Sequence, residues 1–437
     1  MWYDIENSSI LADKENYSMN SDHLIRERDP ALYALLCEER RRQESTLDMV
    51  ASESIQDAVT LALSGSDFAN KTVVGLPGHQ RLLGSEAIDR LEMLAAERAC
   101  TLFGADHANM LPYSGTTANL CVMDGLLQPG DTVLALDPEH GSHASHGRAA
   151  HISSRLYRFV HFGVDAVTQC IDYDALRKTA EDCRPQMMLI GASSYPRLFD
   201  FEQLADIAHN IGAYLVVDMA HTTGLTAAGV IPSPVPYADA VTASCTKTMC
   251  GTHTGFILCK DALREKIDRG VYPGVLASMH PATIAAAAWA LRRASEPSFR
   301  ALMQQVLVNT TALADALQQR GLALLTGGTD CHLFVLDLRG RKTDGDALGV
   351  ILAEMGIWVN SKRIPHDPAP VPMGIRAGCT VLTQRGMKEA DMTAIADLFA
   401  CAVNAGECGY SAADMNEWKA AVSALCTRFP TEYNQTL

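Results

Sequence analysis

Between residues 88 and 260, short apolar segments alternate with segments in which apolar residues recur at helical spacing. The apolar segments predict β-strands, and they span residues 132–137, 156–163, 186–194, 213–221 and 238–245. Helical spacing occurs over residues 88–104, 173–183 and 201–212. Because strands that alternate with helices form a mostly parallel sheet covered on both faces, this region predicts an α/β domain.

The pattern changes after about residue 300. It predicts a long helix over 299–321, a later helix over 388–404, and short apolar segments at 331–338, 346–356, 357–360 and 374–383. This order of elements predicts a smaller α+β unit. Near the start of the chain, residues 29–47 predict a helix with Pro30 in its first turn, followed by a loop over 49–56.

These patterns divide the chain into three parts. Residues 1–28 form a polar N-terminal tail, 29–295 form an N-terminal arm with the large domain, and 296–437 form the small C-terminal domain. The tail is polar and unpatterned, which is typical of a mobile end. No repeat or low-complexity linker separates the two domains, and we therefore expect them to pack closely.

Composition argues against several classes of protein. The chain has 437 residues, with 36 Lys and Arg against 51 Asp and Glu, and its net charge of -15 comes without a basic cluster. Binding to nucleic acid or to an anionic membrane is therefore not expected. The 13 cysteines include no C-x-x-C pair, which argues against a zinc ribbon or a disulfide framework. Without a signal-peptide pattern or a spanning apolar segment, we expect a cytoplasmic protein.

Candidate ligand-binding residues follow the predicted strands, because ligands bind outside the carboxyl ends of strands in a parallel α/β sheet. Ser114, Gly115 and Thr116 open a predicted helix. The free N–H groups and the dipole at such a helix start bind phosphate. The alternative is that the hydroxyl groups only cap the helix.

Two charged residues end predicted strands of the large domain. Asp218 ends an apolar strand, with His221 three residues later, and a buried carboxylate there needs a partner. Either the protonated ring nitrogen of a cofactor or the amides of the loop would provide one. Lys247 follows the segment 238–245. Burial would make its amine a nucleophile toward carbonyl groups, whereas a solvated surface lysine is the alternative.

Three histidines, His140, His143 and His146, follow one another at three-residue intervals. On a helix they would share one face and could bind a metal, but the surrounding Gly and Ser predict a loop. We therefore predict no metal site and expect an imidazole that stacks on a flat cofactor. Taken together, these segments match the needs of pyridoxal 5'-phosphate, with Lys247 as the Schiff-base amine and Asp218 keeping the ring nitrogen protonated.

Longer motifs carry a family resemblance from about residue 30 to the C-terminus. They are VASES, NK followed by GLPG, LFGADHANMLPYSGTTAN, LLQPGDTVLALDPEHGSHASHG, IGAYLVVDMAHTTGLTAAGV, GGTDCHLFVLDL and GIRAGCTVLTQRG. Through these motifs the chain resembles serine hydroxymethyltransferase, a fold-type-I pyridoxal-phosphate enzyme. The resemblance implies an α/β fold with a large, mostly parallel domain and a smaller C-terminal α+β domain.

The resemblance also implies roles for individual residues. The implied cofactor contacts are Ser114, Gly115, Thr116, His143, Ser193, Asp218, His221, Ser244, Lys247 and, from a second subunit, Ser278. Among these, Lys247, His143, Asp218 and His221 would be catalytic. Arg376 would grip the amino-acid carboxylate with help from Ser52. Because family members share active sites between subunits, we expect a homodimer or a homotetramer.

The chain departs from the family pattern at positions that contact folate or transfer protons. The family loop NKYAEGYPGKRYYGG reads NKTVVGLPGHQRLLG here, so that Val74 replaces the acid/base glutamate and Thr72, Leu82 and Leu83 replace tyrosines. Valine cannot transfer protons. The other altered positions are Pro138, Ser142 and Lys362, which align with folate contacts, and Thr246, His253 and Ala277.

These departures shape the expected activity. We expect aldol or retro-aldol chemistry at the α-carbon of a small amino acid of the glycine, alanine, serine or threonine type, with an aldehyde as the second reactant and without efficient use of tetrahydrofolate. A transaldolase and an α-methylserine-type aldolase or hydroxymethyltransferase are examples. One alternative is a genuine tetrahydrofolate-dependent serine hydroxymethyltransferase. Another is a catalytically silent homologue that binds pyridoxal phosphate.

Overall fold

The structure is a computed structural model that describes residues 21–431. Its largest element is a seven-stranded sheet with the order β2-β8-β7-β6-β5-β3-β4. The strands are β2 (His107–Asn109), β3 (Thr132–Leu136), β4 (Arg158–Phe162), β5 (Met187–Gly191), β6 (Tyr214–Asp218), β7 (Ala240–Ser244) and β8 (Gly255–Cys259). Only the pairings of β8 with β7 and β2 are antiparallel. The predicted α/β domain with a mostly parallel sheet is therefore confirmed.

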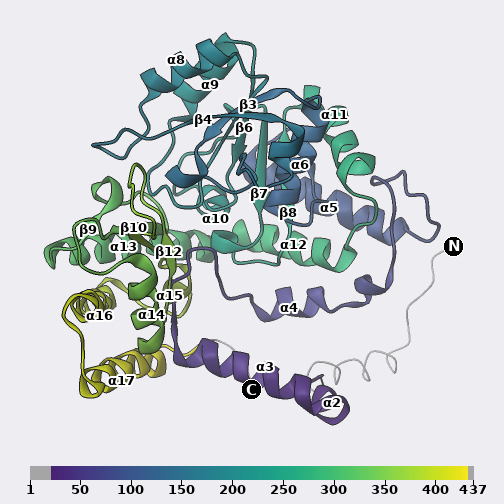
Figure 1. Cartoon of the computed structure of the whole chain (residues 1–437). Coiled ribbons are helices and arrows are strands. Elements are labelled where there is room, and N and C mark those ends of the chain that lie inside the picture. Colours follow the sequence, from purple (N-terminus) through teal and green to yellow (C-terminus); the bar gives the residue numbers. More distant parts are fainter. Residues whose placement is uncertain (1–20, 432–437) are drawn as a thin grey trace.

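Helices cover both faces of this sheet (Figure 1). One face carries α8 (Tyr173–Cys183) and α9 (Phe201–Asn210), and the other carries α5 (Glu86–Phe103), α6 (Gly115–Leu126) and α11 (Arg264–Arg269). Every residue of β5, β7 and β8 is consequently buried. A strand that is buried on both faces needs a continuous apolar run, which is the pattern that the sequence shows at 186–194 and 238–245.

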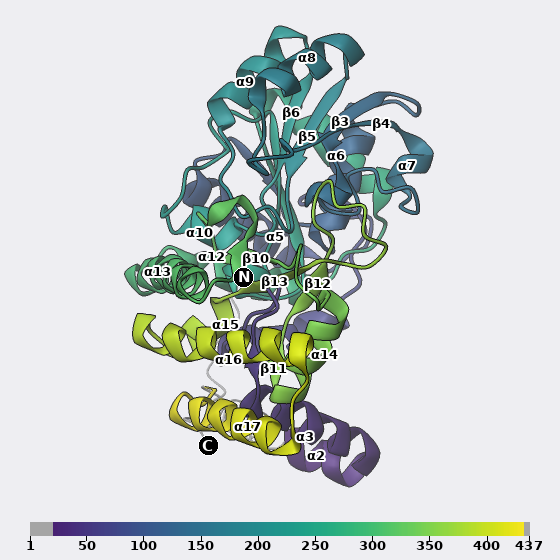
Figure 2. The same ribbon diagram turned by 60° about the vertical axis from the view of Figure 1, so that its left-hand side comes forward.

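The small domain contains a four-stranded antiparallel sheet with the order β12-β13-β10-β9. Its strands are β9 (Ala323–Leu324), β10 (Leu333–Asp337), β12 (Asn360–Lys362) and β13 (Gly374–Gly378). Figure 2 shows α16 (Glu389–Cys408) and α17 (Ala412–Arg428) as two layers below this sheet. Further helices are α7 (Ser153–Leu156), α10 (Thr223–Ala227), α12 (Pro281–Ala294), α14 (Gly345–Met355) and α15 (Thr380–Gln384).

Helix α13 (Pro297–Gln319) connects the two domains. Its first half contributes Phe299 and Met303 to the large hydrophobic core, and its second half contributes Leu313 and Leu317 to the small one. The domain boundary between residues 295 and 296 stays a prediction, but one rigid helix already belongs to both cores. This arrangement explains why the sequence contains no linker there.

The N-terminal arm reaches the small domain before the chain enters the large one. Helix α3 (Pro30–Ser45) is capped by the Asp29 side chain, and β1 (Leu47–Asp48) then pairs in parallel with β11 (Ile357–Trp358). After β1 the chain runs through the loop 49–57 to α4 (Ala58–Ser64). The arm therefore holds the loop that contains Ser52 against the small domain.

Part of the predicted tail is ordered. Residues 21–28 form helix α2 (Ser21–Arg28), which packs beside α3 and joins it through an ion pair between Asp22 and Arg40. The tail as a separate part of the chain stays a prediction, and within it helix α2 has no buried residue and packs beside a neighbouring helix. Residues 1–20 of that tail lie outside the described residues.

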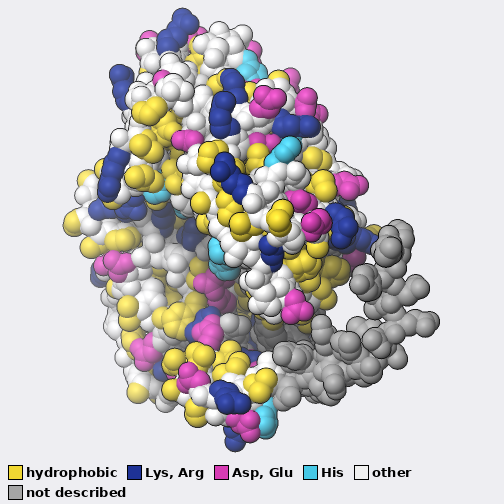
Figure 3. Space-filling view, turned by 90° about the vertical axis from the view of Figure 1, so that its right-hand side faces the viewer, with side chains coloured by type: hydrophobic (Ala, Val, Ile, Leu, Met, Phe, Trp, Pro, Cys, Tyr) yellow, Lys and Arg dark blue, Asp and Glu magenta, His cyan; other side chains and the backbone are white. Residues whose placement is uncertain are grey.

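Charged and apolar side chains mix on the surface (Figure 3), and the cysteines form no disulfide bonds. On the face shown in Figure 3, basic and acidic side chains are interspersed among apolar ones. All thirteen cysteines are free thiols. None of the helices within residues 21–431 combines the length and the apolar character that crossing a bilayer requires.

Gly255 in β8 allows the start of α6 to lie against the sheet. A Cβ atom at this position would overlap the carbonyl oxygen of Ser114 and lie 2.9 Å from the nitrogen of Gly115. We expect Gly255→Ala to lower the free energy of unfolding by about 1–3 kcal/mol, because inserted volume forces the backbone to shift. Denaturant unfolding measures this change.

Gly349 provides the matched control for Gly255. It lies inside α14, and nothing lies within 4 Å of a Cβ atom added there. Gly349→Ala should stabilise the protein by about 0.5–1 kcal/mol, since alanine favours a helix interior. Equal stability of the two variants would contradict the close approach of β8 to α6.

Candidate active site

The carboxyl ends of β5, β6 and β7 and the start of α6 surround a cavity of about 320 Å³. Its walls contain most of the residues proposed from the sequence. They are Ser52, Ser114, Gly115, Thr116, His143, Ser193, Asp218, His221, Ser244 and Lys247. Its position agrees with the general rule that places ligands at this edge of a parallel sheet.

Ser114 and Gly115 form the start of α6. The Ser114 side chain caps the helix by accepting a hydrogen bond from the Thr117 N–H at 3.1 Å. A Cβ atom on Gly115 would lie 3.3 Å from the Cβ of Ala220, so a larger residue would crowd the cavity wall. The capping role is thus observed, and because the first turn of the same helix lines the cavity, phosphate binding there stays a prediction.

Asp218 is held by three donors. Its Oδ2 accepts hydrogen bonds from Asn119 Nδ2 at 2.7 Å and from the ring of His146 at 3.1 Å, and its Oδ1 accepts one from the Ala220 N–H at 3.0 Å. Burial, the largest single effect, raises the pKa of the Asp218 carboxyl, but the hydrogen bonds from His146 and Asn119 and the charges of His146 and His143 together outweigh it and leave this pKa below its ordinary value. Asp218 is therefore an oriented carboxylate that can face a cationic ring nitrogen.

His143 lies on the loop after β3 and lines the same cavity. Its Nδ1 contacts the Ser145 hydroxyl at 2.8 Å. Burial lowers the pKa of His143 to about 4, so its imidazole is neutral at pH 7. A neutral, oriented ring is suited to stacking on a flat cofactor.

Lys247 follows β7 and has a backbone φ of 55°, which is unusual for a residue other than glycine. Its amine has no hydrogen-bond or ion-pair partner within the described part of the chain. Burial lowers the pKa of Lys247, and the Arg376 charge lowers it further, although Asp218 acts in the opposite direction. A lysine with these properties is a candidate nucleophile toward a carbonyl group.

Arg376 on β13 is not one of the wall residues, but it contacts Ser193, which does line the cavity. Its Nη1 donates to the Ser193 carbonyl oxygen at 2.7 Å, and its Nη2 donates to Asn360 Oδ1 at 2.6 Å. The buried Nε has no partner within residues 21–431. Burial lowers the pKa of Arg376 to about 10, so at pH 7 it remains a cation that can bind a carboxylate.

Three supporting residues were not predicted individually. His146 and Asn119 orient Asp218, and His332 lies against His221 with their ring nitrogens 3.3 Å apart. His146 belonged to the histidine series and Asn119 to the helix start, but their partners lie far away in the sequence. His332 directly precedes β10 in the small domain, and no sequence pattern near it indicates a functional role.

The three histidines of the series do not converge. The His140 ring packs against His366, His143 contacts Ser145, and His146 contacts Asp218. Within residues 21–431, no group of three or more His, Cys, Asp or Glu side chains is arranged to hold a metal ion. Each of the three histidines therefore contacts a different residue.

The altered loop does not line this cavity. Thr72, Val74 and Leu82 belong to residues 70–84, and the described wall contains none of them. The Val73 carbonyl accepts a hydrogen bond from the Met279 N–H at 3.4 Å. Leu83 is 96% exposed.

Among the predicted positions Ser278, Ser244, Pro138 and Ser142, only Ser244 lies in the cavity wall. Ser278 is outside the wall, and its carbonyl oxygen accepts a hydrogen bond from the hydroxyl of Tyr113, which does line the cavity. Ser244 contacts the Thr246 hydroxyl at 2.7 Å. Pro138 begins the loop before His143, and Ser142 on that loop is buried with a hydroxyl that lacks a partner within the described residues.

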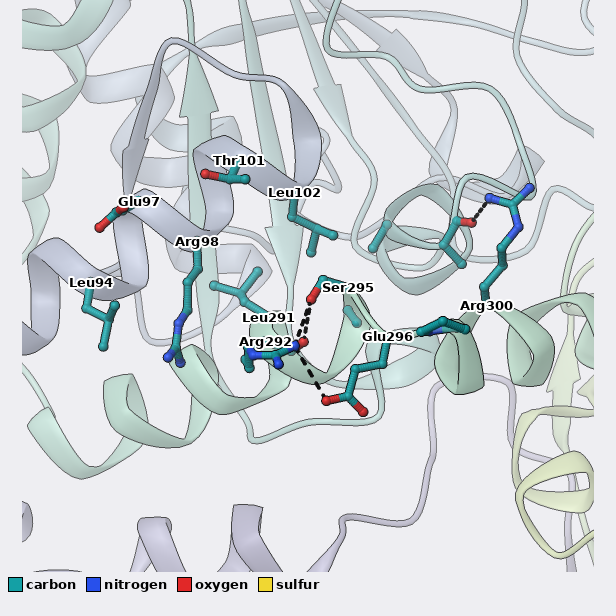
Figure 4. Close-up of a pocket in the computed structure, with 14 residues that line it drawn as sticks. Leu94, Glu97, Arg98, Thr101, Leu102, Leu291, Arg292, Ser295, Glu296 and Arg300 are labelled. Atoms are coloured by element: carbon teal, nitrogen blue, oxygen red, sulfur yellow. Dashed lines mark hydrogen bonds and ion pairs between the residues drawn. The ribbon is translucent and has the colours of Figure 1, made fainter.

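A larger hollow of about 680 Å³ lies elsewhere, between α5, α12 and the start of α13 (Figure 4). Its arginines are bound to neighbouring groups. Arg98 donates to the Ala288 carbonyl, Arg300 donates to the Ala228 carbonyl, and Arg292 contacts Glu296. Because these charges already have partners and no lysine lines this hollow, the smaller cavity is the candidate active site.

The buried histidines make the stability of the cofactor-free protein depend on pH. Burial lowers the pKa of His332 to about 3, and an unfolded histidine has a pKa of about 6.5. Between these values the unfolded chain binds a proton that the folded protein does not bind. The free energy of unfolding should therefore fall as the pH is lowered from 6.5 toward 3, by about 2–4 kcal/mol for this residue.

Urea unfolding of the cofactor-free protein at several pH values measures this dependence. A His332→Gln variant should show a shallower decrease below pH 6.5, because its side chain does not titrate. Parallel decreases in both proteins would contradict the assignment to His332.

The residues of the cavity fit pyridoxal phosphate. A helix start is available for the phosphate, an oriented carboxylate for the ring nitrogen, a neutral imidazole for the ring face and an unpartnered lysine for the aldehyde. A mostly parallel sheet that brings these groups together defines the class of fold-type-I pyridoxal-phosphate enzymes. The family described as "Serine hydroxymethyltransferase" matches residues 25–399. The chain belongs to the serine hydroxymethyltransferase family.

A curated relative supports the same conclusion. The protein called "Serine hydroxymethyltransferase" from Nostoc sp. is 41% identical to this chain over 414 residues. The matched region covers 94% of this chain and 96% of the relative. The similarity therefore extends through both domains, and the chain is a pyridoxal-phosphate-dependent transferase of the hydroxymethyltransferase type.

Proposed function

We propose that this enzyme breaks and forms the Cα–Cβ bond of small β-hydroxy amino acids, with serine or threonine as donor and glycine or alanine as acceptor. The observation that carries the proposal is the position of Arg376. Its guanidinium donates a hydrogen bond to the carbonyl oxygen of Ser193, which lines the same cavity as Lys247 and Asp218. A carboxylate held there would place the α-carbon of the same amino acid near the lysine amine.

Each residue of the cavity would have a defined task. Bound pyridoxal phosphate would supply an electron sink for the bond that breaks at the α-carbon. Ser114, Gly115 and Thr116 would hold its phosphate, and Asp218 would keep its ring nitrogen protonated. Lys247 would hold its aldehyde carbon covalently and, once displaced by the substrate, would move a proton at the α-carbon.

Family membership favours tetrahydrofolate-dependent serine hydroxymethyl transfer as the version of this activity. A second candidate is folate-independent aldol chemistry, as in a transaldolase or an α-methylserine-type aldolase. The residues that support it are Thr72, Val74, Leu82, Pro138, Ser142 and Lys362, which replace folate-contacting and proton-transferring groups. Val74 is the strongest of these, because an alkyl side chain cannot act as an acid or a base.

One experiment distinguishes the folate-dependent activity from the folate-independent one. The purified enzyme is loaded with pyridoxal phosphate and mixed with serine, threonine, glycine or alanine, with and without tetrahydrofolate. Aldehyde release and the visible absorption of the cofactor are recorded. Acceleration of serine cleavage by tetrahydrofolate would support the folate-dependent version, whereas equal aldehyde release without it would support the second candidate. A spectrum that no amino acid changes would indicate a catalytically silent homologue.

We also propose that the enzyme is a homodimer or a homotetramer with shared active sites. Two observations support this assembly. Residues 70–84 do not line the described cavity of their own chain, and this segment presents the almost fully exposed Leu83. An exposed apolar residue on such a loop is suited to contact with a second copy. Sedimentation velocity tests the proposal, and a monomer at micromolar concentration would contradict it.

A further inference from the structure

Four of the described lysines are half-buried, and they fall into two groups. Lys71 donates to the Leu83 carbonyl oxygen at 2.9 Å, and Lys260 donates to Asp239 at 2.8 Å. Lys247 and Lys362 have no hydrogen-bond or ion-pair partner within residues 21–431. Because a half-buried ammonium group without a partner is costly, each of these two lysines is suited to a group from outside the chain. The cofactor aldehyde would be the partner of Lys247, whereas the proposed function gives Lys362 no partner.

The strand register places Lys362 near the residue that grips the carboxylate. In β12, Asn360 lies opposite Arg376 of β13, and Lys362 lies opposite Gly374. Asn360 and Lys362 share one side of the strand, since side chains alternate. Asn360 is the residue whose Oδ1 accepts the hydrogen bond from Arg376 Nη2. Lys362 thus lies about 6.6 Å farther along the same face, the repeat of two residues in a strand.

The charges around Lys362 favour an anion. Burial lowers the pKa of Lys362, and the positive charges of Arg376 and Arg148 lower it further, while Glu139 acts in the opposite direction. Glu139 is already shared, because its carboxylate lies 3.9 Å from Arg148 and 3.5 Å from Arg363. The charges that act on Lys362 are therefore two arginines and one carboxylate that is already shared, although the whole chain carries a net charge of -15.

We propose that Lys362 determines specificity by binding a second carboxylate of the substrate, beside the α-carboxylate that Arg376 holds. The proposal rests on the proposed function, since it assumes an amino acid bound at Arg376. The second carboxylate belongs to the aldehyde portion, so the enzyme prefers a β-hydroxy amino acid with an acidic substituent on Cβ.

A simple acidic substrate illustrates the reaction. In 3-hydroxyaspartate the Cα–Cβ bond would break, the β-hydroxyl would lose its proton, and Cβ would become the aldehyde carbon of glyoxylate. The electron pair of the broken bond would remain at Cα, which then takes up a proton to give glycine. No oxidant or reductant is required. Lys362 would stabilise the carboxylate of glyoxylate throughout and would not transfer a proton.

Steady-state kinetics of the cofactor-loaded enzyme test this proposal. The probes are L-3-hydroxyaspartate and L-threonine, and the quantity compared is the ratio of their kcat/KM values. We expect Lys362→Met to lower this ratio at least tenfold, mainly through the KM for hydroxyaspartate, and Lys362→Arg to restore most of it. Loss of an ionic contact to a substrate group reduces specificity in this way.

An exposed lysine on α8 provides the matched control for Lys362. Lys178 lies exposed on α8, and Lys178→Met should leave the ratio unchanged. Circular dichroism verifies that each variant is folded. An unchanged ratio in a folded Lys362→Met enzyme would overturn the proposal, as would an effect confined to the KM for tetrahydrofolate. If the wild-type enzyme cleaves neither amino acid, the proposed function fails instead.

Discussion

Replacement of Lys247 with alanine is expected to remove the visible absorption of the cofactor Schiff base and to slow turnover by at least about 10³-fold. The half-buried amine has no partner among the described residues, and burial lowers its pKa, so it is available for covalent bonding. The expected loss combines covalent attachment with proton transfer at the α-carbon, and a positioned acid or base alone contributes about 10²–10⁴-fold. Absorption spectra and single-turnover rates measure the two effects separately.

Lys260 offers the control for this variant. It is also a half-buried lysine after a strand of the large sheet, but its amine is paired with Asp239. Lys260→Ala should keep the absorption band and most of the activity. Persistence of the band in Lys247→Ala would show that another amine binds the cofactor.

Replacement of Asp218 with asparagine is expected to lower kcat by about 30-fold to several thousand-fold. The amide keeps the shape of the side chain but not its charge, so a ring nitrogen facing it would lose its proton and the ring would accept electrons poorly. Removing one member of a buried charge pair costs about 2–5 kcal/mol, which gives this range. The hydrogen bonds from Asn119 and His146 show that the carboxylate is held in one orientation.

The control for Asp218 lies at the opposite end of the sheet. Asp239 precedes β7 and accepts hydrogen bonds from Lys260 and from the Leu215 N–H. Asp239→Asn should affect stability and leave kcat within about twofold. Similar losses of kcat in the two variants would indicate that Asp218 acts only through the fold.

The elements with continuous patterns could be predicted from the sequence. Residues 173–183 were predicted as a helix and form α8 with the same bounds, and the segment 238–245 contains β7. The short strand β2 was missed because three residues show no periodicity. Strand β8 was missed because a five-residue apolar run is too short to show a period of its own. Helix α2 was missed since its polar sequence is stabilised by α3 and not by burial.

The site residues that stand at the end of a predicted strand or at the start of a predicted helix could be predicted from the sequence. Asp218, Lys247 and the start of α6 each follow or open an element, and the fold brings such ends together. The partners that orient them could not be predicted in this way. His332 meets His221 only because the small domain packs against the large one, and Asn360 meets Arg376 only through the register of β12 and β13. Register is set by tertiary packing, which a local pattern does not contain.

The pairing of β1 with β11 sets the order in which the active site is completed during synthesis. Leu47 and Ile357 are partners, although 310 residues separate them in the chain. At about 5–20 residues per second, a ribosome produces Ile357 roughly 15–60 s after Leu47. We therefore expect the loop with Ser52 to gain its final position only after the whole large domain has been synthesised. The cofactor side of the site would then form first, and the substrate side would form only when nearly the entire chain has been made.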